Sequence, residues 1–259
     1  MIGIIIAAGL GSRMKQFTIN NPKCLLKIGK KSLLEWSFEN LTKAGCKEVY
    51  VITGYKQEKI KELGYSTIFN KDFKKNNILH SFFCAKHLFD NEIMVSYADI
   101  YVEPQIYTEL SKIKKDIVLT IDKEWEEYYQ DRSGVPTSQA EKVELYNDLI
   151  IDVGKNVKMK KDKKYYEFIG LFKLSKKGSE RIKNLFEEID NKYSKDENFI
   201  FNTSWYKAYI TDYFHYIIKN KNCKIHPHII SKCWAEFDTY KDYLRLDNIT
   251  KTQKLVSIN

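Results

Sequence analysis

Residues 2–13 read IGIIIAAGLGSR, a short apolar run that ends in a glycine-rich turn. The run over 2–8 contains no polar side chain, which is typical of a strand buried on both faces, as in a parallel sheet. A glycine-rich turn after the first strand of such a sheet lets backbone N–H groups approach a phosphate, because glycine has no side chain to obstruct it. This stretch therefore predicts an α/β fold with an anion-binding loop after its first strand.

The rest of the chain alternates between strand-like and helix-like patterns. Residues 33–44 place apolar side chains at helical spacing, and Ser32 and Glu35 have the spacing of a capping box at the start of that helix. Alternating strands and helices favour an open, doubly wound, mostly parallel sheet. We expect strands at 2–8, 48–53, 66–69, 92–97, 116–121, 166–173 and 224–230, and helices at 33–44, 57–63, 77–87, 176–189 and 205–219.

Residues 123–165 interrupt this alternation. The part over 125–141 is polar and aromatic, and residues 149–153 and 156–160, with Gly154 between them, have the pattern of a β-hairpin. The lysine-rich run over 155–164 fits a solvated edge, where lysines discourage strand pairing. With no linker or repeat in the sequence, we expect one domain over 1–259, in which residues 123–165 form an aromatic and β-hairpin lid insertion.

Composition limits the class of protein. The chain has 259 residues and 43% hydrophobic residues, enough for a buried core, and no apolar run approaches the roughly 18 residues of a membrane span. The N-terminus has no basic segment before its apolar run, so we expect no signal peptide. Five scattered cysteines predict reduced thiols and a cytoplasmic protein. The net charge of +9 suits a nucleic acid or an anionic small substrate equally well.

Charged residues near the glycine-rich turn predict a polyphosphate site. Arg13 and Lys23 flank the turn, and a fork-shaped cation beside a point-charge cation suits a polyphosphate. Asp99 follows a predicted strand, where α/β sheets place ligands, and Asp238 supplies a second carboxylate from a distant stretch. Hard oxygen ligands of this kind suit Mg²⁺. Taken alone, Asp99 also fits a helix N-cap and Asp238 a turn residue.

Short motifs occur in a fixed order along nearly the whole chain. They read AAGLGSRM at 7–14, NPKCLL at 21–26, VITGYK at 51–56, YADI at 97–100, FIGL at 168–171 and WAEFDT at 234–239. In this order they resemble the NTP-transferase family, the pyrophosphorylase-type nucleotidyltransferases. Within that family they are most similar to the cytidylyltransferases that act on phosphoglutamine, phosphocholine or aminoalkylphosphonates.

The resemblance implies a Rossmann-like fold and a defined reaction. A CTP-dependent cytidylyltransferase would transfer CMP to a small phosphorylated, amine-bearing acceptor and release pyrophosphate, with Mg²⁺ as cofactor. Its product would serve cell-surface polysaccharide or capsule modification. CTP and the acceptor are then the expected partners, with no nucleic acid and no membrane, and the oligomeric state stays open.

The resemblance also implies roles for particular residues. Aromatic faces in the insertion would hold the ammonium group of the acceptor, and Arg132 would hold its phosphate or carboxylate. The expected catalytic residues are Arg13 and Lys23; the nucleotide-binding residues are Ala7, Ala8, Gly9, Gly11, Ser12, Asn77, Ser81 and Tyr97; the metal ligands are Asp99 and Asp238; and the acceptor-binding residues are Trp125, Arg132, Glu141, Tyr213 and Glu236.

Two other functions fit parts of the same pattern. A sugar-1-phosphate nucleotidyltransferase would keep the fold and change the acceptor, although hexose hydroxyls call for amide side chains rather than an aromatic cluster with an arginine. A nucleotide sensor or nucleic-acid binder would use the basic charge, but it would not require both Asp99 and Asp238. Nucleic-acid binding of that kind would depend strongly on salt concentration.

Overall fold

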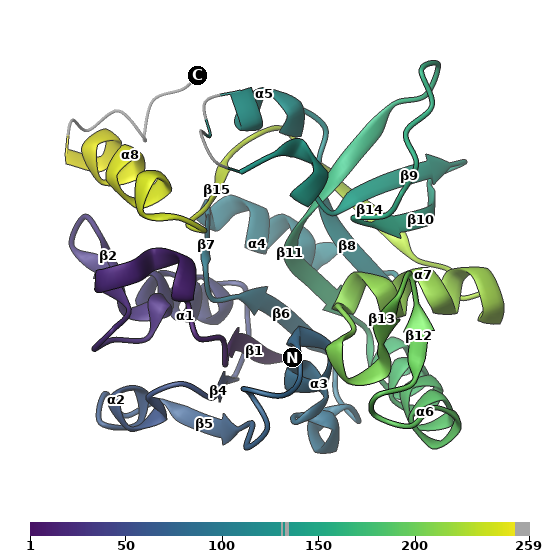
Figure 1. Cartoon of the computed structure of the whole chain (residues 1–259), viewed down its shortest axis with the longest axis horizontal. Coiled ribbons are helices and arrows are strands. Elements are labelled where there is room, and N and C mark those ends of the chain that lie inside the picture. Colours follow the sequence, from purple (N-terminus) through teal and green to yellow (C-terminus); the bar gives the residue numbers. More distant parts are fainter. Residues whose placement is uncertain (131, 133–134, 252–259) are drawn as a thin grey trace.

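The structure, a computed structural model, describes residues 1–130, 132 and 135–251, and strands and helices alternate along most of the chain (Figure 1). The strands are β1 (Ile2–Ala7), β2 (Lys27–Ile28), β3 (Lys31–Ser32), β4 (Glu48–Thr53), β5 (Ser66–Phe69), β6 (Ile93–Tyr97), β7 (Ile100–Val102), β8 (Ile117–Asp122), β9 (Lys142–Tyr146), β10 (Leu149–Gly154), β11 (Tyr165–Leu174), β12 (Asn198–Ile200), β13 (Thr203–Ser204), β14 (His226–Ile230) and β15 (Trp234–Glu236). The α-helices are α1 (Leu33–Lys43), α2 (Gln57–Lys61), α3 (Ile78–Phe83), α4 (Pro104–Lys112), α5 (Trp125–Gln130), α6 (Lys176–Lys192), α7 (Ile210–Lys221) and α8 (Tyr240–Lys251). Short 3-10 helices are η1 (Ser12–Phe17), η2 (Lys23–Leu25), η3 (Lys86–Leu88), η4 (Thr137–Gln139) and η5 (Trp205–Lys207).

The main sheet has nine strands within the described residues, and its principal path runs β10-β9-β11-β6-β1-β4-β5. The strands β6, β1, β4 and β5 are parallel, as are β8 and β14. Strand β11 connects these two groups, because it pairs antiparallel with β6, β8 and β9. The predicted doubly wound α/β fold with parallel central strands is confirmed; the antiparallel pairs of the sheet are those of β11 and the β9–β10 pair.

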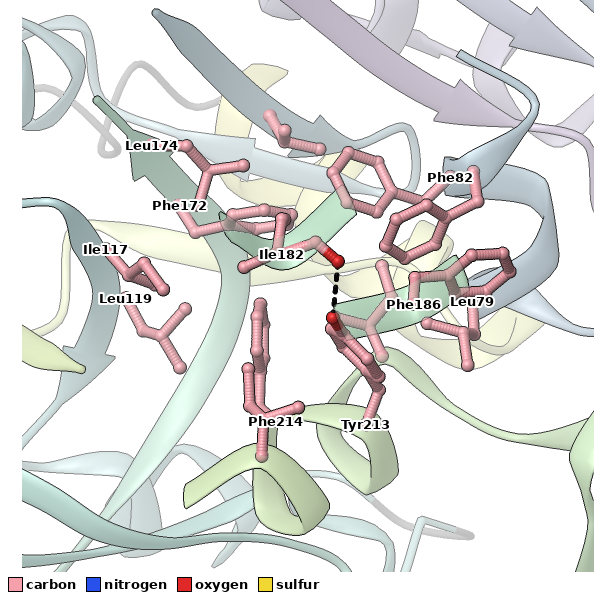
Figure 2. Close-up of a cluster of buried hydrophobic side chains, with 14 of the residues drawn as sticks. Leu79, Phe82, Ile117, Leu119, Phe172, Leu174, Ile182, Phe186, Tyr213 and Phe214 are labelled. Carbon is pink, nitrogen blue, oxygen red and sulfur yellow. Dashed lines mark hydrogen bonds between the residues drawn. The ribbon is translucent and has the colours of Figure 1, made fainter. Parts of the chain in front are cut away.

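Different helices cover the two faces of the sheet. Side chains of β1 alternate between these faces: Ile4 and Ile6 belong to one hydrophobic cluster, whereas Ile5 and Ala7 belong to the other. The first cluster includes apolar side chains of α3, α6 and α7, part of which Figure 2 shows. The second includes side chains of α1 and α4. Burial on both faces explains why the first strand reads as an uninterrupted apolar run.

Elements with a strong local pattern lie where the sequence predicts them. The capping box of α1 is present: Ser32 Oγ accepts a hydrogen bond from the Glu35 N–H at 3.1 Å, and Glu35 Oε2 accepts one from the Ser32 N–H at 2.6 Å. The expected strands at 48–53 and 66–69 coincide with β4 and β5. The expected helix at 205–219 is split, because the turn η5 comes first and α7 begins only at Ile210.

The predicted hairpin at 149–153 and 156–160 is wrong. Strand β10 does form there, but it pairs with the preceding strand β9. The turn between them consists of Asn147 and Asp148, whose φ angles are +46° and +59°. Asn and Asp tolerate this left-handed conformation, and two such residues match the twist of a tight hairpin. The hairpin therefore lies one strand earlier than predicted.

The segment 123–165 contains α5 and the β9–β10 hairpin. The hairpin adds the strands β10 and β9 to one end of the main sheet, because β9 pairs with β11. Helix α5 lies next to β15, as the upper part of Figure 1 shows, and the Tyr128 hydroxyl bridges the two by accepting from the Glu236 N–H at 2.7 Å. This segment thus brings aromatic side chains to the end of the sheet where β15 lies.

Two further features concern the chain as a whole. All five cysteines are free thiols, as their scattered spacing predicts. None of the helices in the described ranges combines the length and the apolar character needed to cross a membrane.

Gly170 allows the Tyr97 side chain to pack unusually close to the backbone of β11. Its φ angle is +85°, and a Cβ atom there would lie 2.5 Å from the ring carbon Cδ2 of Tyr97. The pairing of β11 with β8 is irregular between Phe168 and Phe172, at this same point. A glycine is therefore required both by the backbone conformation and by the Tyr97 ring that packs on it.

We predict that Gly170→Ala costs more stability than Gly64→Ala. Gly64 is a matched control, because its φ angle is +84° and a Cβ atom there would meet nothing within 4 Å in the described part of the chain. The Gly64→Ala substitution should lower the free energy of unfolding by about 1 kcal/mol, because it strains the backbone. Gly170→Ala should lose about 1–3 kcal/mol more, because the Tyr97 ring must shift. Urea denaturation measures both losses, and equal losses would contradict the packing argument.

Candidate active site

A cavity of about 560 Å³ opens at the carboxyl ends of β1 and β6. The glycine-rich turn after β1 forms one side of it, together with Lys23. The Asp99 side chain follows β6, and Glu236 and Asp238 come from β15 and the residues after it. This edge of a parallel sheet is where α/β proteins place their ligands. The cavity is therefore the candidate active site.

Backbone pairing brings the two distant acidic stretches together. Strand β15 pairs antiparallel with β7, so that Glu236 lies opposite Ile100. The Phe237 N–H then donates a hydrogen bond to the Asp99 carbonyl oxygen at 2.9 Å. One ligand atom each of Asp99, Glu236 and Asp238 lies within 4.8 Å of the others. The predicted pairing of Asp99 with Asp238 in space is thus observed, with Glu236 as a third member; we call these three the carboxylate group.

Two cations bind the carboxylate group directly. Lys23 Nζ lies 2.9 Å from Asp99 Oδ2 and 3.4 Å from Asp238 Oδ1. Arg13 Nη1 lies 3.0 Å from Asp238 Oδ2, and its side chain is 62% exposed at the cavity mouth. Lys23 is held between two carboxylates, whereas Arg13 is free to move at its solvent side. The two predicted phosphate-binding cations and the two predicted metal ligands therefore form one ionic network.

Burial and charge move the pKa values of this network in different directions. Burial lowers the pKa of Lys23, but Asp99 and Asp238 outweigh it and raise that pKa overall. Burial raises the pKa of Asp99, but Lys23 outweighs it and lowers that pKa overall. Burial and the negative charges of Asp238 and Asp99 raise the pKa of Glu236 to about 8. At Glu236, burial and the two neighbouring carboxylates thus outweigh the positive charges of Arg132 and Lys23.

Arg132 contacts two members of the carboxylate group, Glu236 and Asp238, from the protein interior. Its side chain is fully buried, and Nε and Nη2 donate to the two carboxylate oxygens of Asp242 at 3.0 and 3.2 Å. Nη1 donates to Glu236 Oε2 at 3.1 Å, and Nη2 lies 3.8 Å from Asp238 Oδ2. Burial lowers the pKa of Arg132, but Asp242 and Glu236 outweigh it and raise that pKa overall. Arg132 therefore compensates three acidic side chains at once.

A second acidic region lines the same cavity. The Tyr129 hydroxyl donates to Glu167 Oε1 at 2.6 Å, and the Thr211 hydroxyl donates to Glu141 Oε1 at 3.0 Å. Burial, which the Lys155 charge only partly offsets, raises the pKa of Glu141 to about 7. Burial also raises the pKa of Glu167. We call Tyr129, Glu141 and Glu167 the acidic wall.

The residues predicted to bind the nucleotide all line the cavity. Asn77 caps α3 through its side-chain oxygen, which accepts from the Ile78 N–H at 2.8 Å, and its amide nitrogen donates to the Lys207 carbonyl oxygen at 2.9 Å. Ser81 Oγ accepts from Asn70 Nδ2 at 2.9 Å. The cavity-lining members of this predicted set are Ala7, Ala8, Gly9, Gly11, Ser12, Asn77, Ser81 and Tyr97.

Tyr213 does not reach the cavity, which corrects its predicted role in acceptor binding. Its ring is buried among the side chains of α3 and α6, and its hydroxyl donates to the Ile182 carbonyl oxygen at 2.5 Å (Figure 2). Its spacing on α7 reflects the core-facing side of an amphipathic helix. The sequence shows an aromatic residue at this position, but not which face of the helix is covered by the sheet.

Trp125 and Arg132 are also separated from the cavity surface in the described part of the chain. The Trp125 ring is buried against Tyr129 and Val135, and its Nε1 donates to the Tyr165 carbonyl oxygen at 3.1 Å. Arg132 has no exposed side-chain surface and binds carboxylates of the protein itself. The prediction that these two residues contact the acceptor directly is therefore corrected. Both pack behind the cavity surface and contact residues that line it. Glu141 and Glu236, the other acceptor residues predicted, do line the cavity.

Three important residues escape the sequence analysis. Glu167 is a charged residue inside an otherwise buried strand, and that mismatch is the signal that could have revealed it. Lys155 lines the cavity with its Nζ 4.2 Å from the centre of the Tyr209 ring, whereas the run over 155–164 is predicted to be a solvated edge. Asp242, the main partner of Arg132, has no sequence signal because 110 residues separate the two.

The fold and the site define a class of protein. A glycine-rich turn at the end of the central strand, two cations beside it and a carboxylate group across from it are the parts that a nucleotidyltransferase requires. The chain belongs to the family of MobA-like NTP transferase domains, whose model matches residues 3–148.

Individual relatives and structures resemble the chain over nearly its full length. The CTP:phosphoglutamine cytidylyltransferase of Campylobacter jejuni is 29% identical over 255 residues, covering 93% of this chain and 97% of that protein. The structure of the CTP:phosphocholine cytidylyltransferase from Streptococcus pneumoniae has a TM-score of 0.72 at 20% identity, covering 96% of this chain and 98% of that one. A UDP-glucose pyrophosphorylase has a TM-score of 0.73 at 16% identity, covering 97% and 98%. The two structures share the fold of this chain.

We predict that Arg132→Met strongly destabilises the protein. The substitution keeps a similar volume but leaves the buried Asp242 and the half-buried Glu236 without their positive partner, which costs about 3–5 kcal/mol. Arg181→Met is the control, because Arg181 is exposed and only its Nη2 donates to a carbonyl oxygen, that of Lys221 at 3.4 Å. Urea denaturation of both variants measures the difference. Similar midpoints for the two variants would show that Arg132 does not have this stabilising role.

We predict that Glu141 makes stability depend on pH between about 4.5 and 7. Its pKa is about 7 in the folded protein and about 4.3 in an unfolded chain, so the folded state binds the proton more tightly. The stability that this gives is present below pH 4.5 and is lost as the pH rises through 7. Glu141→Gln stays neutral, so its Tm relative to the wild type should rise from pH 5 to pH 8. A constant Tm difference across that range would contradict the shifted pKa.

Proposed function

We propose that this nucleotidyltransferase uses CTP and transfers CMP to a small phosphorylated, amine-bearing acceptor. One observation carries the proposal: the glycine-rich turn, Lys23 and Arg13 line the same cavity as the acidic wall. The turn and its two cations suit a nucleoside triphosphate, and the acidic wall suits a cationic acceptor. Similarity to the Campylobacter jejuni enzyme over 93% of the chain supports both the nucleotide and the acceptor class.

In the proposed reaction, an oxygen of the acceptor phosphate attacks the α-phosphorus of CTP. The new P–O bond forms as the bond to the β-phosphate oxygen breaks, and pyrophosphate leaves. The attacking oxygen is already an anion at neutral pH, so no strong general base is required. Lys23 and Arg13 would stabilise the negative charge that shifts toward the leaving group, and the protein otherwise contributes positioning.

The residues present fit a divalent cation such as Mg²⁺. Asp99, Glu236 and Asp238 offer hard oxygen ligands in one group, and burial together with the charges of Asp238 and Asp99 raises the pKa of Glu236 to about 8 despite its ion pair with Arg132. When bound there, the cation would neutralise phosphate charge. We therefore include Glu236 with Asp99 and Asp238 in the proposed cation site, although the sequence analysis assigns it to the acceptor.

The acceptor side of the cavity favours an amine over a hexose. Glu141 and Glu167 line it with carboxyl groups, and both have raised pKa values because burial outweighs the positive charge around them. A positively charged amine would add to that charge. The amide side chains of Asn76, Asn77 and Gln139 also line the cavity, and they are the feature that a sugar-1-phosphate nucleotidyltransferase would use.

Several finer assignments follow from the proposed reaction. The segment 123–165 would act as a lid on the acceptor side, since it supplies Tyr129 and Glu141. Five free thiols support a reducing compartment, and we infer that the protein works in the cytoplasm. That the product serves cell-surface polysaccharide or capsule modification stays a prediction.

A pyrophosphate-release assay tests the proposed function. Each of the four ribonucleoside triphosphates is combined with phosphoglutamine, phosphocholine, O-phosphoethanolamine, 2-aminoethylphosphonate or glucose 1-phosphate, with Mg²⁺ present. We expect turnover with CTP and at least one nitrogen-bearing acceptor, and little with glucose 1-phosphate. Efficient turnover of glucose 1-phosphate alone would establish the sugar-phosphate alternative instead. Release without any acceptor would identify a simple hydrolase.

A further inference from the structure

One carboxylate oxygen of the acidic wall is buried and has no partner. Glu167 is only 3% exposed and lines the cavity. Its Oε1 accepts the hydrogen bond of Tyr129, but no donor in the described part of the chain reaches its Oε2. A buried acceptor left unsatisfied costs about 1–3 kcal/mol. This atom therefore marks a place where a ligand that donates a hydrogen bond would be favoured.

The cations nearest to Glu167 are already committed to other groups. Lys142 lies opposite Glu167 in the pairing of β9 with β11, but its Nζ donates to the Lys155 carbonyl oxygen at 2.8 Å. Arg132 donates to Asp242 and Glu236. The carboxylates Glu236 and Glu141 add further negative charge around Glu167. The chain thus leaves Oε2 without a counterion in a negative environment.

A second buried polar atom lines the same cavity without a partner. The Tyr97 hydroxyl is buried, and within the described ranges no group forms a hydrogen bond with it. The Tyr97 ring is fixed by its packing on Gly170 and by an edge contact with Phe168 at 5.9 Å. This hydroxyl is an observation independent of the acidic wall, and it too indicates a polar ligand in this part of the cavity.

Two aromatic rings that line the cavity, those of Tyr129 and Tyr209, are poorly placed to hold a quaternary ammonium group. Such a group binds over open aromatic faces, because it has no N–H to donate. Here the Arg132 guanidinium lies 5.3 Å from the Tyr129 ring centre, and Lys155 Nζ lies 4.2 Å from the Tyr209 ring centre. Cations of the protein therefore already cover these two rings, and a trimethylammonium group would also leave Glu167 Oε2 unsatisfied.

We propose that Glu167 Oε2 accepts a hydrogen bond from an N–H of the acceptor, so that the enzyme selects acceptors whose nitrogen carries hydrogen over quaternary ammonium acceptors. This inference rests on the proposed function and names the acceptor class at the same site. An ionised Glu167 beside a primary ammonium forms a charge-assisted hydrogen bond, which is stronger than a neutral one. Tyr129 positions Glu167 through the bond to its other oxygen.

A series of four acceptors tests the selection directly in the wild-type enzyme. O-Phosphoethanolamine and its N-methyl, N,N-dimethyl and N,N,N-trimethyl derivatives, the last being phosphocholine, replace the N–H groups one at a time by methyl groups. With CTP and Mg²⁺ fixed, kcat/KM for the acceptor should fall along the series and drop by about 10²-fold or more from the first member to the last. The series needs no variant, so it stands even if substitutions at Glu167 prevent folding.

The variant Glu167→Gln tests whether the selection among these acceptors depends on Glu167. The variant can still accept the Tyr129 hydrogen bond, but it places an NH₂ donor where Oε2 stood, opposite the donors of the ammonium. Its KM for O-phosphoethanolamine should rise at least about tenfold, its KM for CTP should stay unchanged, and its preference along the series should disappear. Glu144→Gln is the matched control, because Glu144 lies on β9 outside the cavity and pairs with Lys163.

The outcomes separate the inference from the proposed function. Phosphocholine used as well as O-phosphoethanolamine would overturn the inference and leave a CTP-dependent enzyme for amine-bearing acceptors. A folded Glu167→Gln variant that keeps the wild-type preference would also overturn it. Turnover of none of the four, with glucose 1-phosphate turned over, would overturn the proposed function itself.

Discussion

The structure depends on the compensation of buried carboxylates by a few cations at one end of the sheet. Asp99 comes from one part of the chain and Glu236, Asp238 and Asp242 come from another, and they would repel one another strongly without the charges of Arg132, Lys23 and Arg13. Ion pairs at this depth gain little net stability, because desolvation offsets the attraction. Losing one partner is nevertheless costly, so the network fixes how α5, α8, β15 and the glycine-rich turn sit together.

The same network prepares the cavity for its proposed substrates. A nucleoside triphosphate and a divalent cation would enter together as opposite charges: the phosphates meet Lys23 and Arg13, and the cation meets the carboxylate group. Neither ligand then leaves a buried charge of the protein without a partner. Arg13 is well placed for such an exchange because most of its side chain faces solvent, whereas Lys23 is held between two carboxylates.

The sequence predicts those features that a single element carries in its own pattern. The apolar run of β1, the capping box of α1 and the position of Asp99 after β6 are all local, and the structure has them. Sequence-based prediction fails where the position or role of a side chain depends on residues far away in the chain. Whether Tyr213 faces the core or a ligand is decided by the packing of α7 on the sheet, and the hairpin register is decided by the turn at Asn147 and Asp148. The role of Arg132 could not be read from the sequence for the same reason, since Asp242 lies 110 residues away.

Arg132 illustrates how a residue can govern acceptor binding without touching the acceptor. Its guanidinium holds Glu236 of the carboxylate group, and its face lies against the ring of Tyr129, which in turn orients Glu167. One buried side chain thereby connects the proposed cation site to the acidic wall of the same cavity. A free arginine at the surface would attract any anion, whereas an arginine fully committed to Asp242 and Glu236 leaves Glu167 Oε2 without a hydrogen-bond donor. The selectivity of this site for a cationic, hydrogen-bonding acceptor therefore follows from where its positive charge is already engaged.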